Sequence, residues 1–271
     1  MKNKDLKEKY NRMHAQGPDA WFDDGAEERM AILKMGHPWT GLKVLEIGCG
    51  EGQLAADMVI GTRGDLRGGA SVVRAVDYSE TAIAKAKARW GESEFLRFHC
   101  GDYRKLENSK INDRLVMQGV LEHLDDPWKE LKWMMDKLLV DGGDVIASSP
   151  GFINPRGFVW MTLDLVGAVM SKTDLHFLHP WEFEEFALRN GCEIEVRSCD
   201  NEWGFGAKMR HDLQERIPKA LDDGALNVND KKLGEFMEWL QKAGQIAPAS
   251  GLSGATIIYK IKKNDQTVRI L

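Results

Sequence analysis

Long hydrophobic runs are missing from this sequence of 271 residues. The most apolar stretch, 158–170, is too short to cross a bilayer and contains Asp164. The first ten residues, MKNKDLKEKY, are charged throughout and lack the apolar segment of a secretion signal. We therefore expect a cytoplasmic protein without a membrane span.

Cysteine is scarce, and its spacing does not suggest a metal site. No CxxC pair is present, and no histidine follows a cysteine at the spacing of a zinc ligand. The four residues concerned are Cys49, Cys100, Cys192 and Cys199. We expect reduced thiols, as in other cytoplasmic proteins, and no bound metal.

An excess of positive charge is missing as well. The 37 Lys and Arg residues stand against 42 Asp and Glu residues, which gives a net charge of −5. A dedicated nucleic-acid binder normally carries a basic face that neutralises phosphates. We therefore expect no nucleic-acid partner.

The phosphate-binding motifs of two large enzyme classes are also missing. No G-x-x-x-x-G-K-[ST] segment occurs, which excludes a P-loop nucleoside triphosphatase. The glycine-rich segment 48–52 lacks the G-x-G-x-x-G spacing of a Rossmann dehydrogenase, because its sixth position is Gln53. Dinucleotide binding is therefore disfavoured.

Strands and helices alternate through residues 41–150. Short apolar and β-branched runs bounded by turn residues predict strands at 43–47, 71–76, 94–100, 114–118 and 144–148. Helical patterns separate most of these runs, and Ser79 is a good N-cap for the helix at 80–90. Such alternation predicts a parallel sheet with helices on both faces, hence an α/β fold.

The pattern after residue 150 is less regular. An alternating run at 192–198 and an apolar run at 256–261 predict two more strands. Helices are expected near 180–187, 207–221 and 231–243.

Polar groups follow three of the predicted strands in succession. The glycines after the first strand let a ligand approach backbone N–H groups at a helix N-terminus. Asp77 ends the second strand, where its carboxylate can accept both hydroxyls of a ribose. Asp102 follows the third strand and can accept an exocyclic amine, although turn chemistry would also explain it. One sheet edge thus offers groups for the parts of one adenosine.

Four segments resemble, in order, the motifs of class I S-adenosylmethionine-dependent methyltransferases. They are VLEIGCGEGQLA (44–55), AVDYS (75–79), CGDY (100–103) and QGVLEHLDDP (118–127). The resemblance is closest to the small-molecule branch, with its quinone-biosynthesis and sugar O-methyltransferases, and continues in TDLHFLHPWEFEEFALRNGCEIEV (173–196). One departure is the long insert 61–69, where the family usually turns tightly.

The resemblance implies a Rossmann-like seven-stranded sheet with its last strand antiparallel, plus helical cap insertions. It also implies S-adenosylmethionine as cofactor and S-adenosylhomocysteine as product. By motif, the glycines would face the methionine part, Asp77 the ribose, and Asp102 the adenine. The residues that match the cofactor-binding motifs are Glu46, Gly48, Cys49, Gly50, Asp77, Tyr78, Asp102, Tyr103, Gln118 and Gly119.

Three histidines are candidates for a general base. Methyl transfer is an in-line displacement, so the enzyme aligns the acceptor and removes its proton where it carries one. His123 follows the fourth strand, while His176 and His179 precede the helix at 180–187. An amine or an acidic hydroxyl needs no base, and a metal-assisted reaction would need several converging carboxylates.

We predict a single methyltransferase domain over 1–271 with a helical lid at 1–40 and a cofactor-binding core at 41–150. Acceptor-side helical insertions are expected at 151–180 and 200–250. In the lid, Trp21 and Phe22 are expected to close over the cofactor.

The predicted function is methyl transfer from S-adenosylmethionine to a small molecule, at oxygen rather than nitrogen. The alternatives are an N-methyltransferase, a macromolecule methyltransferase and a non-enzymatic binding subunit of the same fold. A homodimer is compatible with this prediction.

Overall fold

The computed structural model describes residues 3–16, 25–61, 69–106, 110–165, 168, 174–223, 229–246 and 251–264. Trp21, Phe22 and residues 62–68 of the predicted insert lie outside this part. Within the described ranges, no helix has the length and hydropathy of a membrane span.

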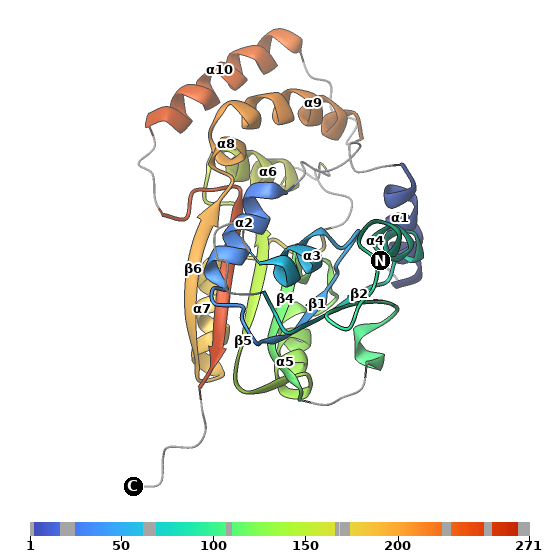
Figure 1. Ribbon diagram of the computed structural model, residues 1–271. Coiled ribbons are helices and arrows are strands. Elements are labelled where there is room, and N and C mark those ends of the chain that lie inside the picture. The colour runs from blue at the N-terminus through green and yellow to red at the C-terminus, as the bar shows by residue number, and fades with distance from the viewer. Residues whose placement is uncertain are drawn as a thin grey trace, which may run out of the picture.

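Seven strands form one sheet in the order β3-β2-β1-β4-β5-β7-β6 (Figure 1). Strands β1 to β5 pair in parallel, whereas β7 is antiparallel to both of its neighbours, β5 and β6. The strands are β1 (Lys43–Ile47), β2 (Val72–Asp77), β3 (Leu96–Cys100), β4 (Asn112–Gln118), β5 (Leu139–Pro150), β6 (Cys192–Cys199) and β7 (Thr256–Lys263). The predicted seven-stranded sheet with an antiparallel last strand is confirmed.

Ten α-helices and two short 3-10 helices accompany the sheet in the described ranges. They are α1 (Asn3–Gln16), α2 (Ala26–Met35), α3 (Gln53–Ile60), α4 (Glu80–Trp90), η2 (Tyr103–Lys105), η3 (Leu121–His123), α5 (Pro127–Lys137), α6 (Pro155–Leu165), α7 (Pro180–Arg189), α8 (Asn201–Gly204), α9 (Ala207–Asp223) and α10 (Asp230–Ile246). Ser79 caps α4 by accepting a hydrogen bond from the Ala82 N–H at 3.1 Å, as predicted.

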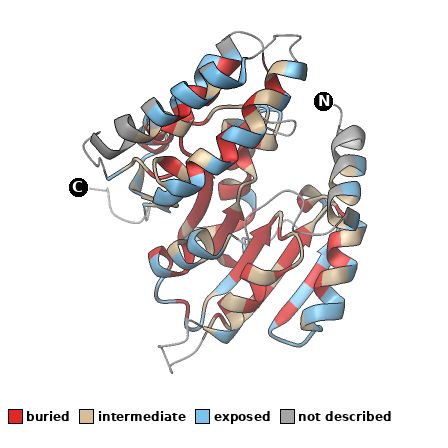
Figure 2. Cartoon of the chain, turned by 90° about the horizontal axis from the view of Figure 1, so that it is seen from above, coloured by how far each residue is buried: buried red, intermediate tan, exposed pale blue. Residues whose placement is uncertain are grey.

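Apolar side chains cover both faces of the sheet. Helices α2, α3 and α4 pack on one face, with Ile32 and Met58 fully buried among strand residues. Helices α5 and α7 pack on the other face through Met134 and Phe183. Figure 2 shows the buried residues concentrated in the strands, while the helices carry the exposed surface.

A third cluster of apolar residues lies in the helical cap. Trp160 of α6, Met209 of α9 and Met237 of α10 pack together there. Helices α6, α8, α9 and α10 gather at one end of the sheet (Figure 1). That end is the carboxyl edge of β5, because α6 follows Pro150 after a short loop.

The strand order reverses between β1 and β4, so the loops that follow these two strands leave in opposite directions. Ligands of open α/β sheets bind in the crevice outside such a reversal. The two loops nevertheless pack closely against each other. A Cβ atom added to Gly48 would lie only 2.5 Å from Cγ2 of Val120, which leaves no room for a side chain there. With a φ of 75°, Gly48 is a position where only glycine fits without strain.

We expect Phe183→Ala to destabilise the fold strongly. The Phe183 ring is fully buried and stacks on Tyr259 of β7 with ring centroids 3.6 Å apart. Its removal should lower the free energy of unfolding by about 3–5 kcal/mol, measured by denaturant titration. Leu188→Ala, on the same helix but 81% exposed, is the control and should change it by less than about 0.5 kcal/mol. Equal losses in the two variants would contradict the assignment of α7 to the sheet core.

Candidate active site

The carboxylate of Asp77 ties the glycine loop after β1 to the start of α4. The Gly50 N–H donates to Asp77 Oδ2 at 2.8 Å, and the Ser79 N–H donates to Oδ1 at 2.8 Å. The N–H groups of Gly48 and Cys49 donate to the Val76 carbonyl at 2.8 and 3.1 Å. The loop is therefore folded against the carboxyl end of β2.

Titratable side chains are concentrated around this loop. Burial raises the pKa of Asp77, although its two N–H bonds oppose the shift. Burial and the neighbouring Asp77 and Asp57 carboxylates raise the pKa of Glu46 well above its usual value. In the part of the chain that the structure describes, Glu46 Oε2 is buried without a hydrogen-bond partner. Burial also raises the pKa of the Cys49 thiol, which keeps it neutral.

The segment after β3 joins the same edge. The Gly101 N–H donates to the Asp77 carbonyl at 2.9 Å, and the Tyr78 hydroxyl is hydrogen-bonded to Asp102. Tyr103 differs from the other motif residues, because its ring is buried in the core and its hydroxyl donates to Glu130 Oε2 at 2.7 Å. The structure thus brings Tyr78 and Asp102 next to Asp77 but turns Tyr103 into the interior.

The end of β4 and the residue after it are fixed to β5 and to helix α2. The Gly119 N–H donates to Ser148 Oγ at 3.1 Å, and the Gln118 amide donates to Glu28 Oε2 at 2.7 Å. Burial raises the pKa of Glu28. Helix α2 is thereby fastened to the end of β4, close to the contact between Gly48 and Val120.

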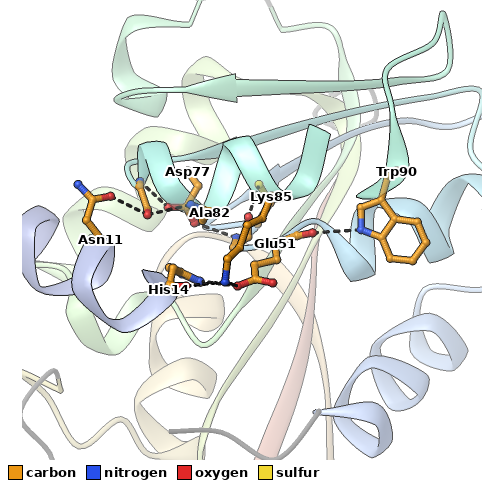
Figure 3. Close-up of polar contacts among 10 residues, drawn as sticks. Asn11, His14, Glu51, Asp77, Ala82, Lys85 and Trp90 are labelled. Atoms are coloured by element: carbon orange, nitrogen blue, oxygen red, sulfur yellow. Dashed lines mark hydrogen bonds and ion pairs between the residues drawn. The ribbon is translucent and has the colours of Figure 1, made fainter. Parts of the chain in front are cut away.

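Helix α1 lies beside the glycine loop and the start of α4, with Asn11 and His14 pointing toward them (Figure 3). The Ser79 hydroxyl donates to Asn11 Oδ1 at 2.7 Å, and His14 Nδ1 lies 3.2 Å from Glu51 Oε1. Lys85 of α4 donates to the same Glu51 oxygen at 3.0 Å. Sequence reasoning did not single out these α1 residues, although Lys7, Asn11 and His14 recur at the spacing of one helical face.

The same face of α1 reaches His123. The Tyr10 ring contacts the His123 imidazole edge-on, with centroids 5.9 Å apart. Burial and the carboxylates of Glu122 and Asp174 raise the pKa of the Tyr10 hydroxyl, which keeps it protonated. One helix therefore touches both the glycine-loop region and the candidate base.

The loop before α7 is fastened to the segment that carries His123. His123 Nδ1 lies 3.4 Å from Asp174 Oδ1. The Leu175 and His176 N–H groups donate to the Glu122 carbonyl at 2.8 and 3.3 Å, and His176 Nε2 lies 2.9 Å from the Leu124 carbonyl. His176 thus contacts the backbone carbonyls on both sides of His123.

Glu122 is a buried acid that the sequence did not reveal. Its Oε2 atom has no hydrogen-bond partner among the described residues, and only 2% of the residue is exposed. Burial and the nearby Asp174 carboxylate raise the pKa of Glu122 well above its usual value. Asp174 was missed as well, because nothing in the sequence pairs it with a residue 51 positions earlier.

His179 lies in a different environment from the other two candidates. Its ring stacks on Trp181 with centroids 4.3 Å apart and meets Phe152 edge-on at 5.8 Å. Burial lowers its pKa, which favours the neutral imidazole. The structure therefore associates His123 and His176 through one loop and holds His179 among aromatic rings.

Charged side chains of the cap adjoin the same loop. Arg156 Nε donates to Asp212 Oδ2 at 3.0 Å, and its guanidinium lies over the Trp160 ring. The Asp174 carboxylate also acts electrostatically on Arg156. In the described ranges, no three His, Cys, Asp or Glu side chains are grouped so that they could hold a metal ion.

Comparisons with known proteins agree with this geometry. Residues 44–143 match a sequence family described as a methyltransferase domain. A search of curated protein sequences finds no match.

Several solved structures share the fold. A chain in complex with the Trm112 methyltransferase activator of Haloferax volcanii is similar with a TM-score of 0.61 and 16% identity, covering 97% of this chain and 100% of that one. The N-methyltransferase NodS of Bradyrhizobium japonicum has a TM-score of 0.57 and 13% identity, covering 95% of this chain and 98% of that one.

A third example contains the methyl donor. The phosphoethanolamine N-methyltransferase 2 of Haemonchus contortus, in complex with S-adenosyl-L-methionine, has a TM-score of 0.53 and 19% identity, covering 88% of this chain and 52% of that one. The family match therefore places a methyltransferase domain over residues 44–143, which include the glycine loop and the strands around it, on a fold shared with S-adenosylmethionine-dependent methyltransferases.

Proposed function

We propose that the chain transfers a methyl group from S-adenosylmethionine to a hydroxyl oxygen of a small molecule. The observation that carries the proposal is the common face of α1, which touches Ser79 and Glu51 beside Asp77 and also touches His123. A group that can take a proton therefore lies beside the edge that suits the cofactor, and a hydroxyl acceptor needs such a group.

The residues at this edge fit S-adenosylmethionine. Each oxygen of Asp77 accepts one N–H bond, and a carboxylate oxygen has room for a second donor such as a ribose hydroxyl. The unpartnered Oε2 of Glu46 fits the positive charge of the cofactor. The residues proposed to hold it are Glu46, Gly48, Cys49, Gly50, Asp77, Tyr78, Asp102, Gln118 and Gly119, with Tyr103 supporting them from the core.

When bound, S-adenosylmethionine supplies a methyl group on a positively charged sulfur, which keeps the electron pair of the broken bond. His123 takes the proton that the acceptor hydroxyl loses, so that the oxygen presents a free electron pair. A neutral imidazole suits this task near neutral pH. His176 is proposed to fix the loop beside His123, and His179 to line the acceptor side with Phe152.

The proposed division of the chain is one methyltransferase domain with three additions. Residues 1–40 form a lid over the cofactor edge, residues 41–150 the cofactor-binding core, and residues 151–180 and 200–250 the acceptor-side cap. The cap has its own apolar cluster, which includes Trp160 and Met237, so it can form a wall at the carboxyl edge of the sheet.

A small-molecule acceptor also accords with the net charge of −5, which disfavours RNA as the substrate. A cytoplasmic location, the lack of a nucleic-acid partner and a homodimer stay predictions from the sequence. A methyltransferase-fold subunit that only binds a partner is the non-enzymatic alternative, and it would not bind the cofactor.

An amine acceptor is the second candidate, and one observation favours it. Glu122 is buried with an unpartnered oxygen beside Asp174, and Glu28 adds a third acid nearby. When ionised, such acids attract an ammonium ion and can take the proton that it must lose before its nitrogen accepts a methyl group. A screen of small alcohols, phenols and amines with a labelled methyl donor separates the two, since an O-methyl product supports the proposal and only N-methyl products support the alternative.

Asp77→Ala should weaken S-adenosylmethionine binding because the ribose hydroxyls lose their acceptor. We expect a loss of about 1–3 kcal/mol by calorimetry. Asp136→Ala, which removes an exposed carboxylate of α5, is the control and should leave the affinity unchanged. Equal affinity of Asp77→Ala and the wild type would remove Asp77 from the cofactor site.

The affinity for S-adenosylmethionine should rise with pH more steeply than that for S-adenosylhomocysteine. Since burial raises the pKa values of Glu46 and Asp77, these acids lose their protons only above the usual carboxyl range, and the added negative charge attracts the sulfonium. S-adenosylhomocysteine has no sulfonium. Calorimetry between pH 5 and 8 tests this, and Glu46→Gln should flatten the difference. Parallel pH curves for the two ligands would contradict the electrostatic fit.

His123→Ala should cut turnover about 100-fold or more while cofactor affinity stays the same. The control is His211→Ala, since His211 is an exposed histidine of α9 and its loss should leave turnover unchanged. Turnover is measured with the acceptor found in the screen. Near-normal turnover of His123→Ala would show that His123 is not the base, which would leave His176, His179 or a reaction without a base.

A further inference from the structure

His123 and Asp174 form a partly buried pair made from distant segments. Their side chains are 17% and 11% exposed, and Nδ1 of His123 lies 3.4 Å from Oδ1 of Asp174. His123 ends the short helix after β4, whereas Asp174 lies in the loop before α7. The contact therefore exists only in the folded protein.

Hydrogen bonds to the backbone hold together the two segments that carry these side chains. The carbonyl of Glu122, just before His123, accepts the N–H groups of Leu175 and His176, just after Asp174. The carbonyl of Leu124, just after His123, lies 2.9 Å from the His176 ring nitrogen. Because these bonds flank His123 and directly follow Asp174, they hold the two segments side by side, with the Asp174 carboxylate next to the imidazole.

The other charged and titratable groups around the pair come from three elements. Tyr10 of α1 contacts the second side of the imidazole, and burial raises its pKa, so it adds no charge. Glu122, on the same short helix as His123, has a raised pKa for the same reason. Arg156 of α6 interacts with Asp174 but is paired with Asp212. Asp174 is therefore the carboxylate in direct contact with His123.

A carboxylate at Nδ1 has two effects on a histidine base. It holds the Nδ1–H tautomer, which leaves the Nε2 electron pair available, and it stabilises the imidazolium that forms when Nε2 takes a proton. At 3.4 Å the contact is longer than a typical hydrogen bond, and it becomes an ion pair once the ring is protonated, which strengthens it.

We infer that Asp174 is a positioning residue that orients the His123 imidazole and stabilises its protonated form during methyl transfer. This inference rests on the proposed role of His123 as the base. The proton of the acceptor hydroxyl passes to His123 Nε2 and afterwards to water, while Asp174 keeps its charge throughout.

The direct test is an NMR titration of the His123 ring in the full, isotope-labelled chain with S-adenosylhomocysteine added. His123→Ala identifies the signal by its loss. In Asp174→Asn the midpoint of the titration should move to lower pH, and in Asp174→Glu it should return toward the wild-type value. Asp164→Asn, at an exposed position of α6, should leave it unchanged.

Kinetics supply the second measurement. Asp174→Asn should lower kcat about 10-fold or more and shift the acidic limb of its pH profile in the same direction as the NMR midpoint, with KM for S-adenosylmethionine unchanged. Asp174→Glu should restore part of the loss. Unfolding midpoints of all variants show whether each is folded.

The outcomes separate this inference from the proposed function. If His123→Ala is inactive but Asp174→Asn moves neither the midpoint nor kcat, the positioning role is overturned and the base remains. If His123→Ala keeps its turnover, the proposed base is wrong and the inference falls with it, even where the midpoint moves. A fall in kcat without a shifted limb, and without rescue by Asp174→Glu, would also overturn the positioning role.

Discussion

A buried carboxylate at the carboxyl end of β2 is the constraint on which the rest of the site depends. Asp77 lies where burial penalises its charge, and two backbone N–H groups compensate for that penalty. One belongs to the glycine loop and the other to the first turn of α4. The loop must therefore stay folded against β2, and its glycines permit the backbone turns that this requires.

Helix α1 extends this arrangement from the cofactor edge to the candidate base. Its polar face contacts Ser79 and Glu51, and its Tyr10 ring contacts His123. Because all of these contacts come from one helix, removal of α1 would expose the glycine-loop region and His123 at the same time. The glycine-loop region and the His123 segment are in this way joined through a single element.

The cap and the loop before α7 supply the remaining part of the site. The loop is held by backbone N–H bonds to the Glu122 carbonyl and by the contact of the His176 ring with the Leu124 carbonyl, which join it to the segment after β4. The buried acids Glu122 and Glu46 carry unpartnered oxygens within the described part of the chain, and burial raises the pKa of both.

The sheet and its glycine loop could be predicted from the sequence, because apolar periodicity and glycine spacing are local signals. The strand after 94 and the cap helices were found within a few residues. The predicted fifth strand, 144–148, was too short, since Leu139 pairs with Asn112 beyond an irregularity that no local pattern marks. Tyr103 showed the limit of motif reasoning, because only the packed core decides that its ring turns toward Glu130.

The contacts that join distant segments were not predictable. Asp174 and Tyr10 are ordinary polar residues in their own segments, and they meet His123 only through the tertiary fold. Glu122 was not predictable either, because only the folded structure shows that its side chain is buried. A local sequence pattern indicates which faces of a helix or strand are apolar, but it does not indicate which loops meet at the end of a sheet.

A crystal structure of the full chain with S-adenosylhomocysteine tests the central claim most directly. The account predicts the ribose hydroxyls within hydrogen-bond distance of Asp77, the adenine beside Asp102, and the sulfur on the side of the crevice that carries His123. A ligand bound elsewhere, or a sulfur turned away from His123 with α1 between them, would contradict it.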